Sequence, residues 1–310
     1  MIKVVYVIEV TINTSSFGYL FIFIQLCSCS GIDSKSICIL RTYFLSSLFS
    51  LYNDTIMKLF MKNKDDIFKQ FQNSFNGLHG HFHVLERSVS VEEQMKYFKY
   101  SESLKRERAQ IDIDSSALVL ADLEESLDNK RKALVALASS INAHAYRILE
   151  DYSKNPDEEL RDWSQLALLE CKIALESELS EEQQIFISTG LGGKNEKLRF
   201  FVLVKTKDKH PLVKYQEDIV LHEFEYALKK SGCELEDFKI ATNFFKMIVL
   251  VPIGCNIKGI FDSIINECNQ YGDFLSPVYT VTNVKILDDE EIAKIIDRDG
   301  DNKSNTKASS

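Results

Sequence analysis

The chain has 310 residues, of which 45% are hydrophobic and 27% charged, a balance typical of a folded globular protein with two domains. Its net charge of −9 argues against broad phosphate-backbone binding, because such binding depends on clustered Lys and Arg. The seven cysteines include no CxxC pair, so they indicate buried thiols in a reducing compartment rather than a disulfide framework or a cysteine-based zinc site.

Residues 1–60 differ in composition from the rest of the chain. They are rich in Ile, Phe, Leu and Ser and carry few charges. Two apolar runs, 17–29 and 37–51, are short for a membrane span, and Gln25 or Arg41 interrupts each of them.

Three interpretations of this segment remain open. The translation start is placed too far upstream of Met57 or Met61, the segment is a lipoprotein-type signal ending near Cys27, or it is a membrane anchor. A signal requires a basic beginning, and here Glu9 offsets the only early lysine, so we favour the first interpretation. We therefore expect residues 1–60 to be a non-native leader or an uncleaved extension. The protein is then cytoplasmic, with a lipoprotein or membrane-anchored protein as the alternative.

The next segment, residues 61–189, favours helices because Gly and Pro are nearly absent from most of it. The pattern Lys130-x-x-Ala133-x-x-Ala136-Leu137 recurs as Arg161-x-x-Ser164-x-x-Ala167-Leu168. Between the two copies, Pro156 and Asp157 mark a helix start, where the helix dipole favours an acid.

Asn155 to Leu168 resembles the turn and second helix of a HEAT-type repeat, whose pattern is Asp-Pro-x-x-Arg-x-x-Ala-x-x-Ala-Leu. It departs from that pattern where Trp163 and Ser164 replace small residues and Asn-Pro-Asp replaces Asp-Pro. The resemblance implies a helical surface that binds proteins or nucleic acid. An ordinary helical bundle explains the same spacing equally well.

The pattern changes after the glycine loop 190–194. Strands are expected at 198–205, 235–241, 244–251 and 278–287, and helices at 212–230 and 257–268. The order βαββαβ resembles the split βαβ unit of ferredoxin-like folds, which implies that the first and third strands are central. These two strands are apolar throughout, whereas the others are mixed.

The sequence therefore predicts an α+β protein. An all-helical N-terminal segment precedes a ferredoxin-like βαββαβ two-layer sandwich at 190–296, and a disordered tail follows at 297–310. Both faces of the central strands are apolar, so we expect the helical segment or a second copy of the domain to cover the face away from the helices.

The candidate metal ligands are His79, His81 and His83. Imidazoles at a two-residue spacing face one way on an extended segment, and such clusters bind zinc or copper. Glu86 would add a carboxylate, although Gly80 makes the segment flexible and no further ligand is fixed nearby. The alternative is a polar loop between helices.

Several other patterns lack an essential part. The loop 190–194 enters a strand rather than a helix, so it indicates a hinge or tight connection and not a phosphate loop. His222-Glu223 lacks the second histidine of a zinc protease, and 297–301 lacks the closing glutamate of a calcium loop. Strand 244–251 has aromatics only at its start and a single lysine, which argues against RNA recognition.

No catalytic constellation or cofactor motif emerges from the sequence, so we predict no cofactor. We expect a non-catalytic protein-interaction or regulatory protein that self-associates through its α/β domain. The alternatives are a small-ligand sensor, an RNA-binding protein or an enzyme. The expected partner is a protein or a second copy. Nucleic acid is not expected, and a membrane is expected only if residues 1–56 are a genuine anchor or signal.

Overall fold

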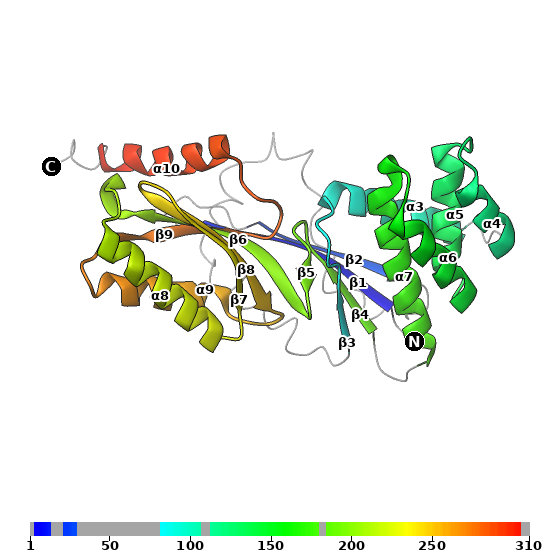
Figure 1. Cartoon of the computed structure of the whole chain (residues 1–310), viewed down its shortest axis with the longest axis horizontal. Coiled ribbons are helices and arrows are strands. Elements are labelled where there is room, and N and C mark those ends of the chain that lie inside the picture. The colour runs from blue at the N-terminus through cyan, green and yellow to red at the C-terminus, as the bar shows by residue number, and fades with distance from the viewer. Residues whose placement is uncertain (1–2, 14–20, 30–80, 107–111, 180–183, 305–310) are drawn as a thin grey trace, which may run out of the picture.

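The computed structural model describes residues 3–13, 21–29, 81–106, 112–179 and 184–304, and the protein is a mixed α and β structure (Figure 1). The helices are α3 (Val91–Arg106), α4 (Ile113–Ala121), α5 (Leu127–Ser139), α6 (Ala143–Lys154), α7 (Arg161–Leu179), α8 (Lys214–Lys230), α9 (Ile257–Asn269) and α10 (Asp289–Ser304). The strands are β1 (Lys3–Asn13), β2 (Phe21–Cys29), β3 (His81–Val84), β4 (Gln184–Ser188), β5 (Gly193–Lys194), β6 (Lys197–Thr206), β7 (Glu234–Ile240), β8 (Phe244–Pro252) and β9 (Leu275–Thr282). None of the described helices is both long enough and apolar enough to cross a bilayer.

The C-terminal part contains the six elements β6, α8, β7, β8, α9 and β9 in chain order. Their strands pair antiparallel in the order β9-β6-β8-β7, so β6 and β8 are the central pair of this unit. The register places Phe201 opposite Ile248, and Leu203 opposite Lys246. Paired residues share a face of the sheet, and successive residues of one strand alternate between the two faces.

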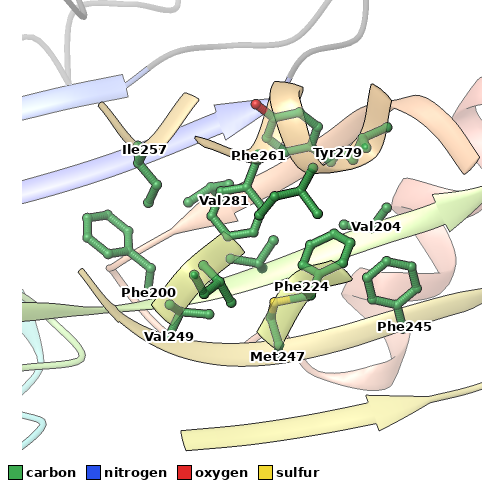
Figure 2. Close-up of a cluster of buried hydrophobic side chains, with 14 of the residues drawn as sticks. Phe200, Val204, Phe224, Phe245, Met247, Val249, Ile257, Phe261, Tyr279 and Val281 are labelled. Carbon is green, nitrogen blue, oxygen red and sulfur yellow. The ribbon is translucent and has the colours of Figure 1, made fainter. Parts of the chain in front are cut away.

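Helices α8 and α9 cover one face of this sheet (Figure 2). Phe224 of α8 and Phe261 of α9 are fully buried against strand residues such as Phe245, and the Phe224 and Phe245 rings meet edge to face with centroids 5.2 Å apart. Since α8 and α9 each present an apolar stripe at helical spacing, burial of these rings fixes both helices on the sheet.

Helix α10 lies across the opposite face, above the sheet in Figure 1. Ile292 is 2% exposed and packs with Phe201 and Leu203 of β6. The second face is therefore covered, as its apolar character requires, by neither of the two expected candidates. The covering helix also continues to Ser304, into the segment for which the sequence predicts a disordered tail.

The sheet extends beyond the C-terminal unit, in the order β3-β4-β1-β9-β6-β8-β7, with β2 paired to β1. Strand β9 is thus not an edge strand, contrary to expectation, because β1 pairs with it. Strands β3 and β4 lie within the segment 61–189, so the prediction that this segment is all-helical is wrong. Their backbone groups pair with each other in parallel and, through β4, with β1.

Helices α3 to α7 pack around a separate apolar core. Trp163 of α7, which departs from the HEAT-type pattern, is buried against the rings of Tyr97 and Tyr100 of α3. Lys130 of α5 is buried with its Nζ 2.9 Å from Asp157, and that hydrogen bond, with one from the Tyr152 hydroxyl, lowers the pKa of Asp157. Burial of the Trp163 ring against Tyr97 and Tyr100 therefore holds α7 on α3.

A buried polar contact joins α3 to the residues that enter the glycine loop. Gln94 of α3 is fully buried, and its Nε2 donates to the carbonyls of Val89 (2.8 Å) and Thr189 (3.1 Å). Its Oε1 accepts a hydrogen bond from the Ser188 hydroxyl. Since both ends of the amide are satisfied, the helical part and the sheet are tied by a network that excludes water.

The glycine loop after Ser188 is a fixed connection rather than a hinge. The Gly193 amide donates to Leu85 O at 2.8 Å, and the Leu191 amide donates to Asn283 O at 2.9 Å. A Cβ at Gly190 would lie 1.8 Å from a carbonyl oxygen of Val284, and Gly192 has a φ of +67°. The glycines are thus needed for close approach and for a left-handed backbone.

We predict that Gln94→Leu lowers the free energy of unfolding by about 2–3 kcal/mol, because it leaves the buried Val89 carbonyl and the buried Ser188 hydroxyl without the partner that Gln94 provides. Urea unfolding followed by circular dichroism measures this. Gln270→Leu, at an exposed position, is the matched control and should change stability by less than about 0.5 kcal/mol. Equal effects of the two variants would contradict the role of Gln94.

Candidate functional site

The predicted histidine cluster is described only in part. His83 lies on β3, and its Nε2 is 3.2 Å from a carboxylate oxygen of Glu176 on α7. His79 and the side chain of His81 lie outside the described residues. Among the described side chains, no three His, Cys, Asp or Glu residues gather into a metal site. Metal binding by His79, His81 and His83 stays a prediction.

The other candidate patterns take ordinary places in the fold. His222 is exposed on α8 and Glu223 beside it is half-buried. Asp297 to Asp301 belong to α10 instead of a loop, so their backbone does not form the turn of a calcium site.

The described cysteines are free thiols, and three of them are buried. Burial raises the pKa of Cys233 to about 11, with a further contribution from the neighbouring Cys255, and it raises the pKa of Cys268 to about 12. A nucleophilic cysteine requires a lowered pKa, so these thiols are inert at neutral pH.

The most distinctive surface is the sheet face beneath α10, which we call the α10 face. Its members are the side chains of the two central strands that point away from α8 and α9. The name is used here for six of them, Phe201, Leu203, Lys205, Phe244, Lys246 and Ile248. In the register, Lys205 is opposite Phe244 and Leu203 is opposite Lys246, so each central strand contributes one aromatic and one basic side chain.

Coverage of the α10 face is uneven. On β6, Phe201 is 1% exposed and Leu203 fully buried beneath the helix, whereas Phe244, Lys246 and Ile248 of β8 are only half-buried. The helix therefore closes the β6 side of the face and leaves the β8 side partly open to solvent.

Lysines of the sheet and its loops meet α10 along its length. Lys246 Nζ lies 3.5 Å from an Asp289 carboxylate oxygen. Lys285 donates a hydrogen bond to Glu291 at 2.5 Å, and this bond raises the pKa of Lys285. The carboxylates of α10 thus face cations of the domain it covers.

The far end of α10 repeats this arrangement. Lys209, in the loop after β6, pairs with Asp297 at 2.9 Å. The buried Lys205 places its Nζ 3.5 Å from the Ile295 carbonyl, where the partial negative charge of the helix backbone faces it. Four lysines therefore meet negative groups on one helix.

An arginine closes the end of the face nearest the glycine loop. Arg199 of β6 donates two hydrogen bonds to the carboxylate of Glu236 of β7, of 2.5 and 2.9 Å, and a third to Leu191 O at 2.8 Å. The Arg199 guanidinium lowers the pKa of Glu236. This bidentate pair ties β6, β7 and the glycine loop together at the border of the face.

Several solved structures resemble part of the chain, and two of them are described below. No family model and no curated protein matches the chain. A protein from Deinococcus radiodurans R1 described as a transposase is 16% identical with a TM-score of 0.28, and the match covers 35% of this chain and 93% of that one. A REP-associated tyrosine transposase bound to a REP hairpin is 11% identical with a TM-score of 0.26, over 30% of this chain and 59% of that one.

These findings correct two predictions. Both similar structures are described as transposases, and one of them is bound to a hairpin. The prediction of a non-catalytic protein-interaction or regulatory protein and the prediction that nucleic acid is not a partner both disagree with these descriptions.

The sequence prediction depended on the net charge of −9, which is a sum over the whole chain. That sum does not record where charges lie. Strand register gathers Lys205 and Lys246 on one face, while many acids lie on other surfaces, such as exposed Glu159 and Glu178 in the helical part. A locally basic face is compatible with an acidic chain.

We predict that Cys233 is alkylated by iodoacetamide at least about tenfold more slowly in the native protein than in urea at pH 8, because burial holds it as a thiol. Its rate should keep rising about tenfold per pH unit between about pH 8 and 10, whereas an ordinary thiol levels off above about 8.5. Mass spectrometry of quenched digests measures both rates. A native rate that levels off near pH 8.5 would show that the thiol is not buried.

Proposed function

We propose that the protein binds a single strand of DNA on the α10 face. The observation that supports this is the placement of one aromatic and one lysine on each central strand, all on the same side of the sheet. Sheet surfaces that bind single strands combine these two residue types, because aromatic rings stack on bases and cations neutralise phosphates.

The chemistry of the face favours a single strand over a duplex. Stacking requires a base that is not already stacked between its neighbours, and Phe244 offers a half-buried ring at the open side of the face. Lys246 lies on the same face two residues further along β8. The ring and the ammonium group are therefore close enough for one nucleotide to contact both. A base and its phosphate would therefore meet both side chains together.

DNA is named rather than RNA because of what the face offers. Rings and lysines contact bases and phosphates, which both nucleic acids share, whereas selective RNA binding depends on contacts to the 2′-hydroxyl. The described polar side chains of the α10 face are Lys205 and Lys246, which suit phosphates. An RNA strand is accordingly the comparison in the test below.

The arrangement that positions the face supports a finer fold assignment. We propose that β6 to β9, with α8 and α9 on one side, form a ferredoxin-like unit. Its support is the strand order β9-β6-β8-β7, with both helices on the face away from α10. The HEAT-type character of α5 to α7 stays a prediction.

We predict that the full chain binds a fluorescein-labelled oligo-dT of about 12 nucleotides at low salt, measured by fluorescence anisotropy. Lys246→Ala should weaken binding about three- to tenfold and reduce the slope of log K against log salt by about one, because one phosphate contact is lost. Phe244→Ala should weaken binding by about 1–3 kcal/mol through lost stacking.

Lys258→Ala is the matched control. Lys258 is also half-exposed and ion-paired, to Asp262, but it lies on α9, on the other side of the sheet. It should leave affinity within about twofold of the unsubstituted protein. Equal weakening by Lys246→Ala and Lys258→Ala would place binding elsewhere. Tighter binding of an oligo-U strand of equal length would replace DNA by RNA as the ligand.

A further inference from the structure

We infer that α10 is an internal competitor for the strand, an acidic helix that occupies the α10 face and moves away when DNA binds. This inference rests on the proposed function and adds its regulation. Three observations support it: the charge of the helix, the way it is held, and the chain that connects it to the sheet.

The carboxylates of α10 stand where phosphates would stand. Asp289 and Asp297 contact Lys246 and Lys209 of the domain, and Glu291 contacts Lys285 in the segment that leads into the helix. From Asp289 to Asp297 the helix rises about 12 Å, at 1.5 Å per residue. A DNA strand carries a phosphate about every 3.4 Å, so a few nucleotides span the same lysines. Since helix and strand satisfy the same cations, they cannot both occupy the face.

The helix is held loosely in comparison with α8 and α9. Ile292 is its single deeply buried side chain among the described residues of α10, whereas Ile295 and Ile296 are half-buried. Two of the carboxylates in its ion pairs are largely exposed, 97% for Asp289 and 77% for Asp297. Exposed ion pairs contribute little and are screened by salt, so among the described side chains of α10 the apolar anchoring comes from Ile292, with Ile295 and Ile296 beside it.

The connection between β9 and α10 permits this movement. Asn283 is fully buried, and its carbonyl accepts a hydrogen bond from the Leu191 amide, so the chain is fixed to that point. The next residues, 284–288, are half-buried or exposed and lie outside any helix or strand. A rotation within this short segment would lift α10 and leave the paired strands intact.

The first experiment compares two variants of the full chain with equal changes in charge. In Asp289→Asn/Glu291→Gln/Asp297→Asn, the acids that face the lysines are neutralised. In the control, Glu159→Gln/Glu178→Gln/Glu225→Gln, exposed acids of other helices are neutralised. We expect the first variant to bind oligo-dT about tenfold more tightly than the unsubstituted protein, and the control to stay within about twofold.

A second variant tests the anchor without changing charge. Ile292→Ala removes most of the buried part of the helix and should also tighten oligo-dT binding, by about three- to tenfold. Hydrogen exchange of the α10 amides, read by mass spectrometry, should become faster in this variant, while β6 and β8 stay protected. Circular dichroism confirms that the rest of the protein remains folded.

The decisive measurement is hydrogen exchange of the unsubstituted protein with and without saturating oligo-dT. The inference expects faster exchange in α10 and slower exchange in β8 when DNA is bound. Binding that depends on Lys246 but leaves α10 protected, with no gain in affinity for either α10 variant, would overturn the inference while the proposed function stands. If no variant binds oligo-dT at low salt, the proposed function itself fails.

Discussion

The structure depends on one packing constraint, namely that the central strands β6 and β8 are apolar on both faces. A sheet of this kind must be covered twice, because each uncovered face would leave rings and aliphatic chains in water. Helices α8 and α9 cover one face and bury Phe224 and Phe261 there. The other face is covered by the single helix α10, through Ile292.

The sequence was sufficient to predict the order of strands and helices from β6 to β9, since strand and helix periods are local properties, although the last strand was expected at 278–287 and lies at Leu275–Thr282. It was also sufficient to predict that the second face is covered. It did not show that α10 is the element that covers this face. The segment of α10 is rich in acidic residues, and only Ile292, Ile295 and Ile296 indicate an apolar stripe. Strands β3 and β4 were missed for a related reason. They are short, and parallel pairing at a distance stabilises them rather than local preference.

The combination of lysines and aromatic rings on the α10 face could not be predicted, because it depends on register. Lys205 and Phe244 are opposite each other only through the pairing of β6 with β8, and no spacing within either strand shows this. Read alone, β8 offered one lysine and an aromatic start, which argued against nucleic acid. The second aromatic and the second lysine come from β6. A binding surface of this type becomes visible only after the strands are paired.

The distribution of local stability connects the fold to the proposed mechanism. Where α3 meets the glycine loop, Gln94 is fully buried and every polar atom of its amide is bonded, so that junction opens only with the rest of the protein. Among its described side chains, helix α10 has one fully buried isoleucine, two half-buried isoleucines and ion pairs with exposed carboxylates. Local opening begins where few apolar contacts are lost, so α10 leaves its place before the junction or the strands do. The element that opens first is therefore the one that lies on the lysines and rings of the sheet. A polyanion needs only to replace exposed carboxylates there, while the buried network around Gln94 keeps the face in register.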